Sequence, residues 1–279
     1  MKQLPLIAST LFMQPWNILP SAHAELALLF RNYTTSNLPE ALQGSGQLES
    51  GVTFDADPVS GITLISLDGI VCKRAPEIMC GPRLVDLAML DLLLADALVD
   101  ETTRTVVLYL NTPGGCGIGL HETSALIQEL RAAGKRVVAY VDYLCASAGY
   151  WLAASCDEIV CAPSSQVGSV GTYVAALDDT EAWKMEGYKL KIFKDGDYKA
   201  MGHPGKEWTK EEEEFLESRK VTWAAEFKNH IRTMRPDLQE SSMQGQTFDA
   251  YIAPDGLIDR LANSITDALT WELELLADT

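Results

Sequence analysis

The sequence predicts an α/β fold with a mostly parallel sheet flanked by helices. Two observations predict it. First, short runs rich in β-branched residues alternate with segments of helical periodicity over most of the chain. Second, 279 residues with 47% hydrophobic residues can form one large globular domain or two small ones. Alternation of this kind favours parallel strands joined by right-handed crossovers.

The predicted elements follow one another regularly. Strands are predicted at residues 61–71, 105–112, 136–143 and 157–162. Helices are predicted at residues 83–100, about 120–133, after Ser147 and at 210–234. The last helix has an apolar stripe that is better explained by packing than by a cofactor site: Leu216, Trp223, Phe227, Ile231 and Met234.

The N-terminal part differs in composition from the rest. Residues 36–60 are rich in Gly, Ser, Asp and Pro, which is typical of a linker or flexible arm. We therefore predict an N-terminal segment and flexible linker at 1–57 and the main domain at 58–279. Residues 1–24 have signal-peptide features, so secretion or membrane association is the alternative, but prolines and polar residues interrupt the apolar stretch. No apolar run is long enough to predict a membrane span.

Charge and cysteine spacing exclude several function classes. The formal net charge is −17 with no Lys/Arg-rich block, so we expect no nucleic-acid partner. The acidic run 211–214 is typical of a solvated first turn of a helix. The six cysteines form no Cys-x-x-Cys motif and lack zinc-site spacing, which indicates buried or half-buried thiols in a reducing compartment. We expect no metal and no cofactor.

Two strand ends are candidates for chemistry, because functional groups in open α/β sheets gather at the carboxyl ends of strands. Gly114 and Gly115 follow the strand 105–112, and adjacent glycines can aim backbone N–H groups at a ligand or simply form a turn. Ser147 follows the strand 136–143 at the entry of a helix, where it could be a nucleophile or merely an N-cap.

A serine nucleophile needs a base. Of the four histidines only His121 lies near a motif, and nothing in the sequence specifically pairs it with Ser147. A desolvated lysine can act instead. Lys199 stands out among the lysines for its turn-rich surroundings, although a lysine in a polar loop is ordinarily just solvated.

Four motifs in order resemble one protein family. They are "LNTPGG", "GKRVVAYVDYLCASAGYWLAASCDEIVCAPSSQVGSVGTYV", "KDGDYKAMGHP" and "GQTFDAYIAPDGLIDRL". Together they resemble the signal peptide peptidase A family of serine proteases, the S49 peptidases, over about residues 60–262. The resemblance implies a ClpP/crotonase-like fold.

The resemblance also assigns roles. In "ASAG", Ser147 matches the nucleophile of a Ser-Lys dyad; in "DYKAMG", Lys199 matches its general base. It further implies Ser169 of "VGSVG" as the serine that holds the lysine, and an oxyanion hole at Gly114, Gly115 and Ala148. Ala148 replaces a glycine of the commoner pattern but keeps the N–H. Family members form homo-oligomeric rings in which neighbouring chains complete each site.

The opening residues "LPLIASTLFMQPWNILPSAHAELALLF" resemble the phage branch of the family, the minor capsid protein C-like head maturation proteases. This branch implies action on scaffold and portal-associated proteins in the host cytoplasm or the prohead. The alternative branch is the cellular signal peptide peptidase A-like enzyme, which degrades signal peptides. Two other classes stay open: a crotonase-type acyl-CoA enzyme, and a non-proteolytic structural subunit of a capsid.

Overall fold

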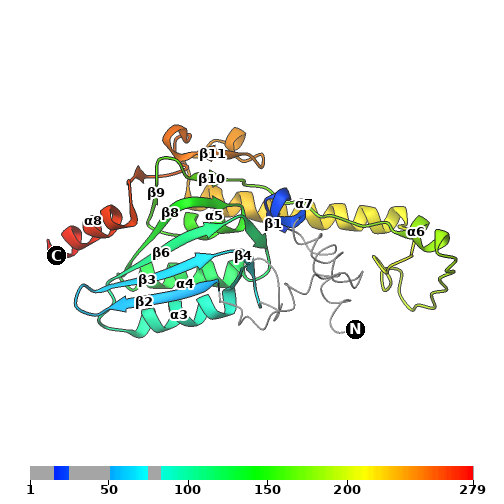
Figure 1. Cartoon of the computed structure of the whole chain (residues 1–279), viewed down its shortest axis with the longest axis horizontal. Coiled ribbons are helices and arrows are strands. Elements are labelled where there is room, and N and C mark those ends of the chain that lie inside the picture. Colours follow the sequence, from blue (N-terminus) through cyan, green and yellow to red (C-terminus); the bar gives the residue numbers. More distant parts are fainter. Residues whose placement is uncertain (1–15, 25–50, 75–82, 279) are drawn as a thin grey trace, which may run out of the picture.

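The computed structural model describes residues 16–24, 51–74 and 83–278. Within these residues the chain forms an eight-stranded sheet, a smaller four-stranded sheet and helices that pack against them (Figure 1). The predicted α/β class, with a mostly parallel sheet flanked by helices, is confirmed.

The large sheet has the order β11-β10-β8-β6-β3-β2, with β9 paired to β8 and β12 to β9. Its central pairs β3–β6, β6–β8, β8–β9 and β8–β10 are parallel, while β2 and β11 are antiparallel additions. The strands are β2 Val52–Asp57, β3 Ile62–Asp68, β6 Thr105–Thr112, β8 Arg136–Ala146, β9 Glu158–Cys161, β10 Gln166–Gly168, β11 Thr247–Asp249 and β12 Arg260–Leu261.

The small sheet has the order β1-β7-β4-β5. β7 lies parallel to β4, and β1, from the N-terminal part of the chain, lies antiparallel to β7. Its strands are β1 Trp16–Ile18, β4 Ile70–Cys72, β5 Leu84–Asp86 and β7 Gly114–Cys116. β7 follows β6 almost directly, so the turn at Gly114 and Gly115, here called the glycine turn, connects the two sheets.

The predicted helices and strands are found close to their predicted places. The helices are α3 Leu87–Val99, α4 Leu120–Ala132, α5 Ala148–Ala154, α6 Thr180–Met185, α7 Lys210–Met234 and α8 Ile265–Ala277, with 3-10 turns η2 Glu240–Ser242 and η3 Ala250–Ile252. Strand β2 lies within the predicted linker range 36–60 and was not predicted as a strand. Only Val52 of this edge strand is buried, so its sequence lacks a strong hydrophobic signal.

Helix α7 confirms its predicted packing stripe. Phe227 and Ile231 are fully buried in the main core, and the N-terminal half of the helix projects from the body (Figure 1). The acidic run begins this helix, but Glu212 is not solvated as predicted. Its carboxylate completes a capping box with Thr209 and pairs with Lys206 at 2.5 Å, which explains how it can be buried.

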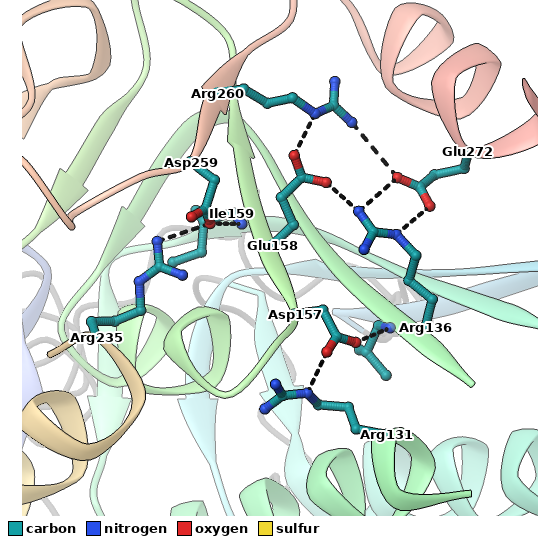
Figure 2. A network of polar contacts seen from close by, with 10 residues as sticks. Arg131, Arg136, Asp157, Glu158, Ile159, Arg235, Asp259, Arg260 and Glu272 are labelled. Atoms are coloured by element: carbon teal, nitrogen blue, oxygen red, sulfur yellow. Dashed lines mark hydrogen bonds and ion pairs between the residues drawn. The ribbon is translucent and has the colours of Figure 1, made fainter. Parts of the chain in front are cut away.

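A network of arginines and carboxylates fastens the C-terminal helix to the large sheet (Figure 2). Buried Glu272 of α8 accepts from Arg136 Nε at 2.7 Å, and Arg136 also pairs with Glu158. Glu158 in turn accepts from Arg260 at 2.5 Å. Beneath these ion pairs, α8 covers a second apolar cluster on the sheet that includes Val138, Tyr140 and Val160.

Candidate active site

Ser147 occupies a strained turn between a strand and a helix. β8 ends at Ala146, α5 begins at Ala148, and the serine between them has φ 56° and ψ −113°. Left-handed φ in a non-glycine residue costs about 1–3 kcal/mol and persists only where the surroundings enforce it. Here the Ser147 N–H donates to Gly168 O at 2.7 Å, and its carbonyl accepts from Trp151 N at 3.0 Å.

The turn is enclosed on all sides. Ser147 is 1% exposed, and its Oγ has no hydrogen-bond partner among the described residues. A Cβ added at Gly149 would lie 2.2 Å from Thr112 Cγ2, so the backbone after the serine packs directly against the end of β6. All seven residues of α5 are buried. The core thus fixes the position of this serine.

Ser169 lies beside Ser147 at the carboxyl ends of two neighbouring parallel strands. β10 is in register with β8, so that Gly168 faces Ala146 and the two serines follow. Ser169 also has a left-handed φ, 55°, and its N–H donates to Gln246 O at 2.7 Å. The structure therefore brings together two of the residues that the sequence singled out.

The glycine turn completes one side of the site. Gly114 has φ 97°, and a Cβ there would lie 2.8 Å from Ser147 Cβ and 2.2 Å from Asn17 O. A Cβ at Gly115 would lie 1.9 Å from Val71 O. Both positions therefore accept only glycine. The Gly114 N–H donates to Thr112 Oγ1 at 3.1 Å, whereas the Ala148 N–H, at the start of α5, has no acceptor within the helix.

Lys199 is not brought to Ser147 within the chain. It is exposed, and its backbone N–H donates to Gly196 O at 3.3 Å. The segment between α6 and α7, drawn in yellow-green, lies at the far end of α7 from α5 and β8 (Figure 1). This segment is held to α6 by the Gly205 N–H, which donates to Asp179 Oδ1 at 2.6 Å.

The cysteines near the site are poor nucleophiles. Burial raises the pKa of the Cys145 thiol, two residues before Ser147, well above its usual value, and raises that of Cys161 to about 12. Cys116 and Cys156 are also buried, and Cys72 is half-buried; Cys80 lies outside the described residues. The described thiols are free, as predicted for buried or half-buried cysteines.

The histidines do not form a triad with Ser147 in the described part of the chain. His121 lies on the surface, with its Nε2 3.9 Å from Glu226 Oε2. His230 stacks on Trp151 and places Nε2 3.0 Å from Ser155 Oγ, but Ser155 is fully buried. Burial lowers the pKa of His230 to about 4, so the ring is neutral. We assign this Ser-His pair to packing at the other end of α5.

The N-terminal strand β1 contributes to this site, although the sequence did not predict it. β1 pairs with the glycine turn in the register Ile18 to Gly114 and Asn17 to Gly115. The strand is only three residues long and follows a proline, so the hydrophobic pattern alone could not indicate it.

Clusters of metal-ligating side chains and membrane-spanning helices are both absent from the described ranges. No group of three or more His, Cys, Asp or Glu side chains there could hold a metal ion. No helix among the same residues is both long and apolar enough to cross a bilayer.

Comparison with known proteins identifies relatives. Residues 129–278, more than half of the chain, match the sequence model of peptidase family S49. Protein MJ0651 of Methanocaldococcus jannaschii is 35% identical over 144 residues, which are 49% of this chain and 46% of that protein. Capsid assembly protease C of Escherichia phage lambda is 24% identical over 294 aligned residues, which cover 97% of this chain and 65% of that protein. The chain spans about half, or less, of the length of the first curated relatives it matches.

Among solved structures, an enoyl-CoA hydratase from Mycobacterium avium has a TM-score of 0.45 and 18% identity. The alignment covers 83% of this chain and 77% of that one.

Proposed function

Because this chain belongs to peptidase family S49, we propose that it is a serine endopeptidase in which Ser147 is the nucleophile. The observation that supports this most is the strained backbone of Ser147, held between the glycine turn and Ser169 at the ends of parallel strands. Strain of this kind at a buried serine has no evident structural purpose and is common at active sites. The high pKa of neighbouring Cys145 leaves the serine as the better nucleophile.

We assign the general base to Lys199 of a neighbouring copy of the chain. The lysine is exposed and belongs to a segment that projects from the body, which suits a contact with another subunit (Figure 1). Burial in such a contact would lower its pKa and supply a neutral amine. Ser169, beside Ser147, is the residue proposed to hold that amine.

The reaction would then proceed as acyl transfer. Neutral Lys199 removes the proton of Ser147 Oγ, and the serine attacks the carbonyl carbon of a peptide bond. The proposed donors to the oxyanion are the backbone N–H groups of Gly114, Gly115 and Ala148. The Gly114 N–H must first leave Thr112 Oγ1. The protonated lysine returns its proton to the leaving amine, and water releases the acyl group. No cofactor takes part.

The proposed substrates are phage capsid proteins. Support comes from the phage relative, whose printed name is a capsid assembly protease and whose alignment covers 97% of this chain. Scaffold and portal-associated proteins are then the expected partners, in the host cytoplasm or the prohead. The second candidate is degradation of signal peptides, as in the cellular branch of the family. The crotonase-type and purely structural alternatives have no use for a strained, buried serine beside Ser169.

Complementation between inactive variants tests both the dyad and its assembly. Ser147→Ala and Lys199→Ala are purified separately and assayed on casein and on a co-expressed scaffold protein, with mass spectrometry of the products. Each variant alone is expected to be inactive. Dissociated and reassembled together, they should recover activity, because some sites receive an intact serine from one chain and an intact lysine from another. Activity of Ser147→Ala equal to that of the unmodified protein would refute the proposal.

A further inference from the structure

Strand β1 lies beside the serine that the proposed function requires to be accessible. Asn17 O and Ser147 Cβ both lie within 3 Å of the point where a Cβ of Gly114 would stand. A peptide carbonyl of the chain itself therefore lies within about 5 Å of Ser147 Cβ. Ser147 is 1% exposed with β1 in place, so a substrate peptide can reach Oγ only if a neighbouring segment moves.

β1 is bound as an added strand on both of its edges. On one side, Leu19 N–H donates to Pro113 O at 2.9 Å. Since hydrogen-bonded and non-hydrogen-bonded pairs alternate in an antiparallel ladder, Asn17 and Gly115 are the next pair placed to exchange backbone hydrogen bonds. On the other side, Trp16 and Tyr173 exchange two backbone hydrogen bonds at 2.9 and 3.1 Å. This is how an extended peptide binds between two strand edges.

The side chains of β1 occupy two different environments. Trp16 and Ile18 are each 3% exposed and pack with Ile70 and Cys116 in a small cluster separate from the main core. The Asn17 side chain is also buried. Its Oδ1 accepts from Thr172 Oγ1 at 2.6 Å, but its Nδ2 has no partner in the described part of the chain. Trp16 and Ile18 are therefore well packed, whereas the buried Asn17 amide group lacks one of its hydrogen-bond partners.

We propose that β1 is an internal ligand of a peptide-binding groove, formed by β7 and the segment around Tyr173, that substrate must enter by displacing it. This inference rests on the proposed function and extends it to the substrate class. The groove takes an extended peptide that runs antiparallel to β7 and carries large apolar side chains one residue before and one residue after the position that faces Ser147. Docked β1 keeps the site closed.

A reversible cross-link tests the groove directly. Trp16 and Cys116 are opposite residues of the ladder, in a pair expected not to exchange hydrogen bonds, so Trp16→Cys should form a disulfide with Cys116. The variant is made in a Ser147→Ala background, and binding of a fluorescein-labelled peptide with the sequence of residues 13–21, MQPWNILPS, is measured by anisotropy. Oxidation should abolish binding, and reduction should restore it. Adding Cys116→Ser to the same variant should remove the redox response.

A milder variant covers the case in which loss of Trp16 disturbs folding. Ile18→Ala keeps the indole and both backbone ladders but weakens the docking of β1. We expect it to bind the peptide about tenfold more tightly than the Ser147→Ala parent, as follows when a binding-competent state becomes more populated. Equal binding by the cross-linked and reduced proteins, with the cross-link verified by mass, would overturn the proposal.

Cleavage by the Trp16→Cys protein with Ser147 intact, measured in its oxidised and reduced forms, separates the groove proposal from the peptidase proposal. Loss of cleavage on oxidation and recovery on reduction supports both. If peptide binding responds to the cross-link but neither form cleaves any substrate, the groove stands and the peptidase proposal fails. If the cross-linked protein cleaves as fast as the reduced one, the groove is wrong while the peptidase proposal stands.

Discussion

The surroundings of Ser147 and of Lys199 are built in opposite ways. The serine is fixed by the ends of three strands, a buried helix and a glycine turn that admits no side chain. The lysine lies in a segment whose neighbouring large side chains face solvent, with Phe193 95% and Met185 89% exposed. One half of the proposed dyad is therefore determined by the folding of a single chain.

No such contacts fix the position of Lys199 among the residues that the structure describes. Exposed aromatic and aliphatic side chains near Lys199 are costly unless something covers them, which is typical of an interface. Ser147 and Lys199 can therefore respond to mutation independently. Changes around Ser147 should alter both stability and activity, whereas changes around Lys199 should alter activity and assembly only.

The largest expected effect is the loss of the proposed nucleophile. Ser147→Ala should lower kcat/KM for casein by about 10⁴-fold or more, because the serine cannot be replaced in acyl transfer. Ser155→Ala is the matched control, since Ser155 is a buried serine at the other end of α5. It should retain cleavage while losing about 1–3 kcal/mol of stability through unpaired partners. Loss of cleavage in both variants alike would point to a folding defect.

Removal of the proposed base should give the same loss of activity without loss of stability. Lys199→Ala is expected to change the free energy of unfolding by less than about 0.5 kcal/mol, as for other exposed side chains. Lys189→Ala, another exposed lysine of the same segment, serves as the control and should remain active. Urea unfolding and casein cleavage measured on the same preparations check this. A strongly destabilised Lys199→Ala would contradict the view that Lys199 contributes little to the stability of a single chain.

The glycine turn should be the most sensitive point for stability. Gly114→Ala places a Cβ 2.2 Å from Asn17 O at φ 97°, so we expect a loss of about 3 kcal/mol or more together with loss of cleavage. Gly187→Ala, near α6, has φ 81° but no atom within 4 Å of its Cβ. It should cost only about 1–2 kcal/mol. Similar unfolding midpoints for the two variants would refute the predicted crowding.

His230, which packs against the C-terminal end of α5, should make the stability of the protein depend on pH. The pKa of His230 is lowered from 6.5 to about 4 by burial, so the unfolded chain binds more protons between these values. Stability from this residue is therefore present above about pH 6.5 and decreases by about 2–3 kcal/mol as the pH falls to about 4. His230→Gln should flatten this part of the profile, measured by urea unfolding from pH 7 to 4.5. An unchanged slope would show that other groups dominate.

The fold and the serine side of the site were predictable because they rest on local signals. The β-branched run 105–112 is strand β6, and the periodic run 210–234 is helix α7, within the predicted bounds. Ser147 was found at a strand end and Ser169 through the family resemblance, and their proximity follows from parallel pairing of β8 with β10. The roles of these residues remain predictions.

What the sequence did not indicate depends on contacts between distant segments. β1 is recognisable only by its partners at residues 114–116 and 173, which lie about a hundred residues away or more. The burial of Glu212 depends on Lys206, whose position no periodicity encodes. The proposed placement of Lys199 beside a serine would depend on another chain, and no pattern within one sequence encodes such a contact.

The length of helix α7 determines how far the segment that carries Lys199 lies from the body that holds Ser147. Its 25 residues span about 37 Å, and only the C-terminal half is anchored in the core. Removing one residue from its free half would retract the far end by about 1.5 Å and rotate it by about 100°. Removing seven, close to two whole turns, would preserve its facing and shorten only its reach. The length of this helix, counted in turns, therefore sets both the reach and the orientation of the segment that carries Lys199.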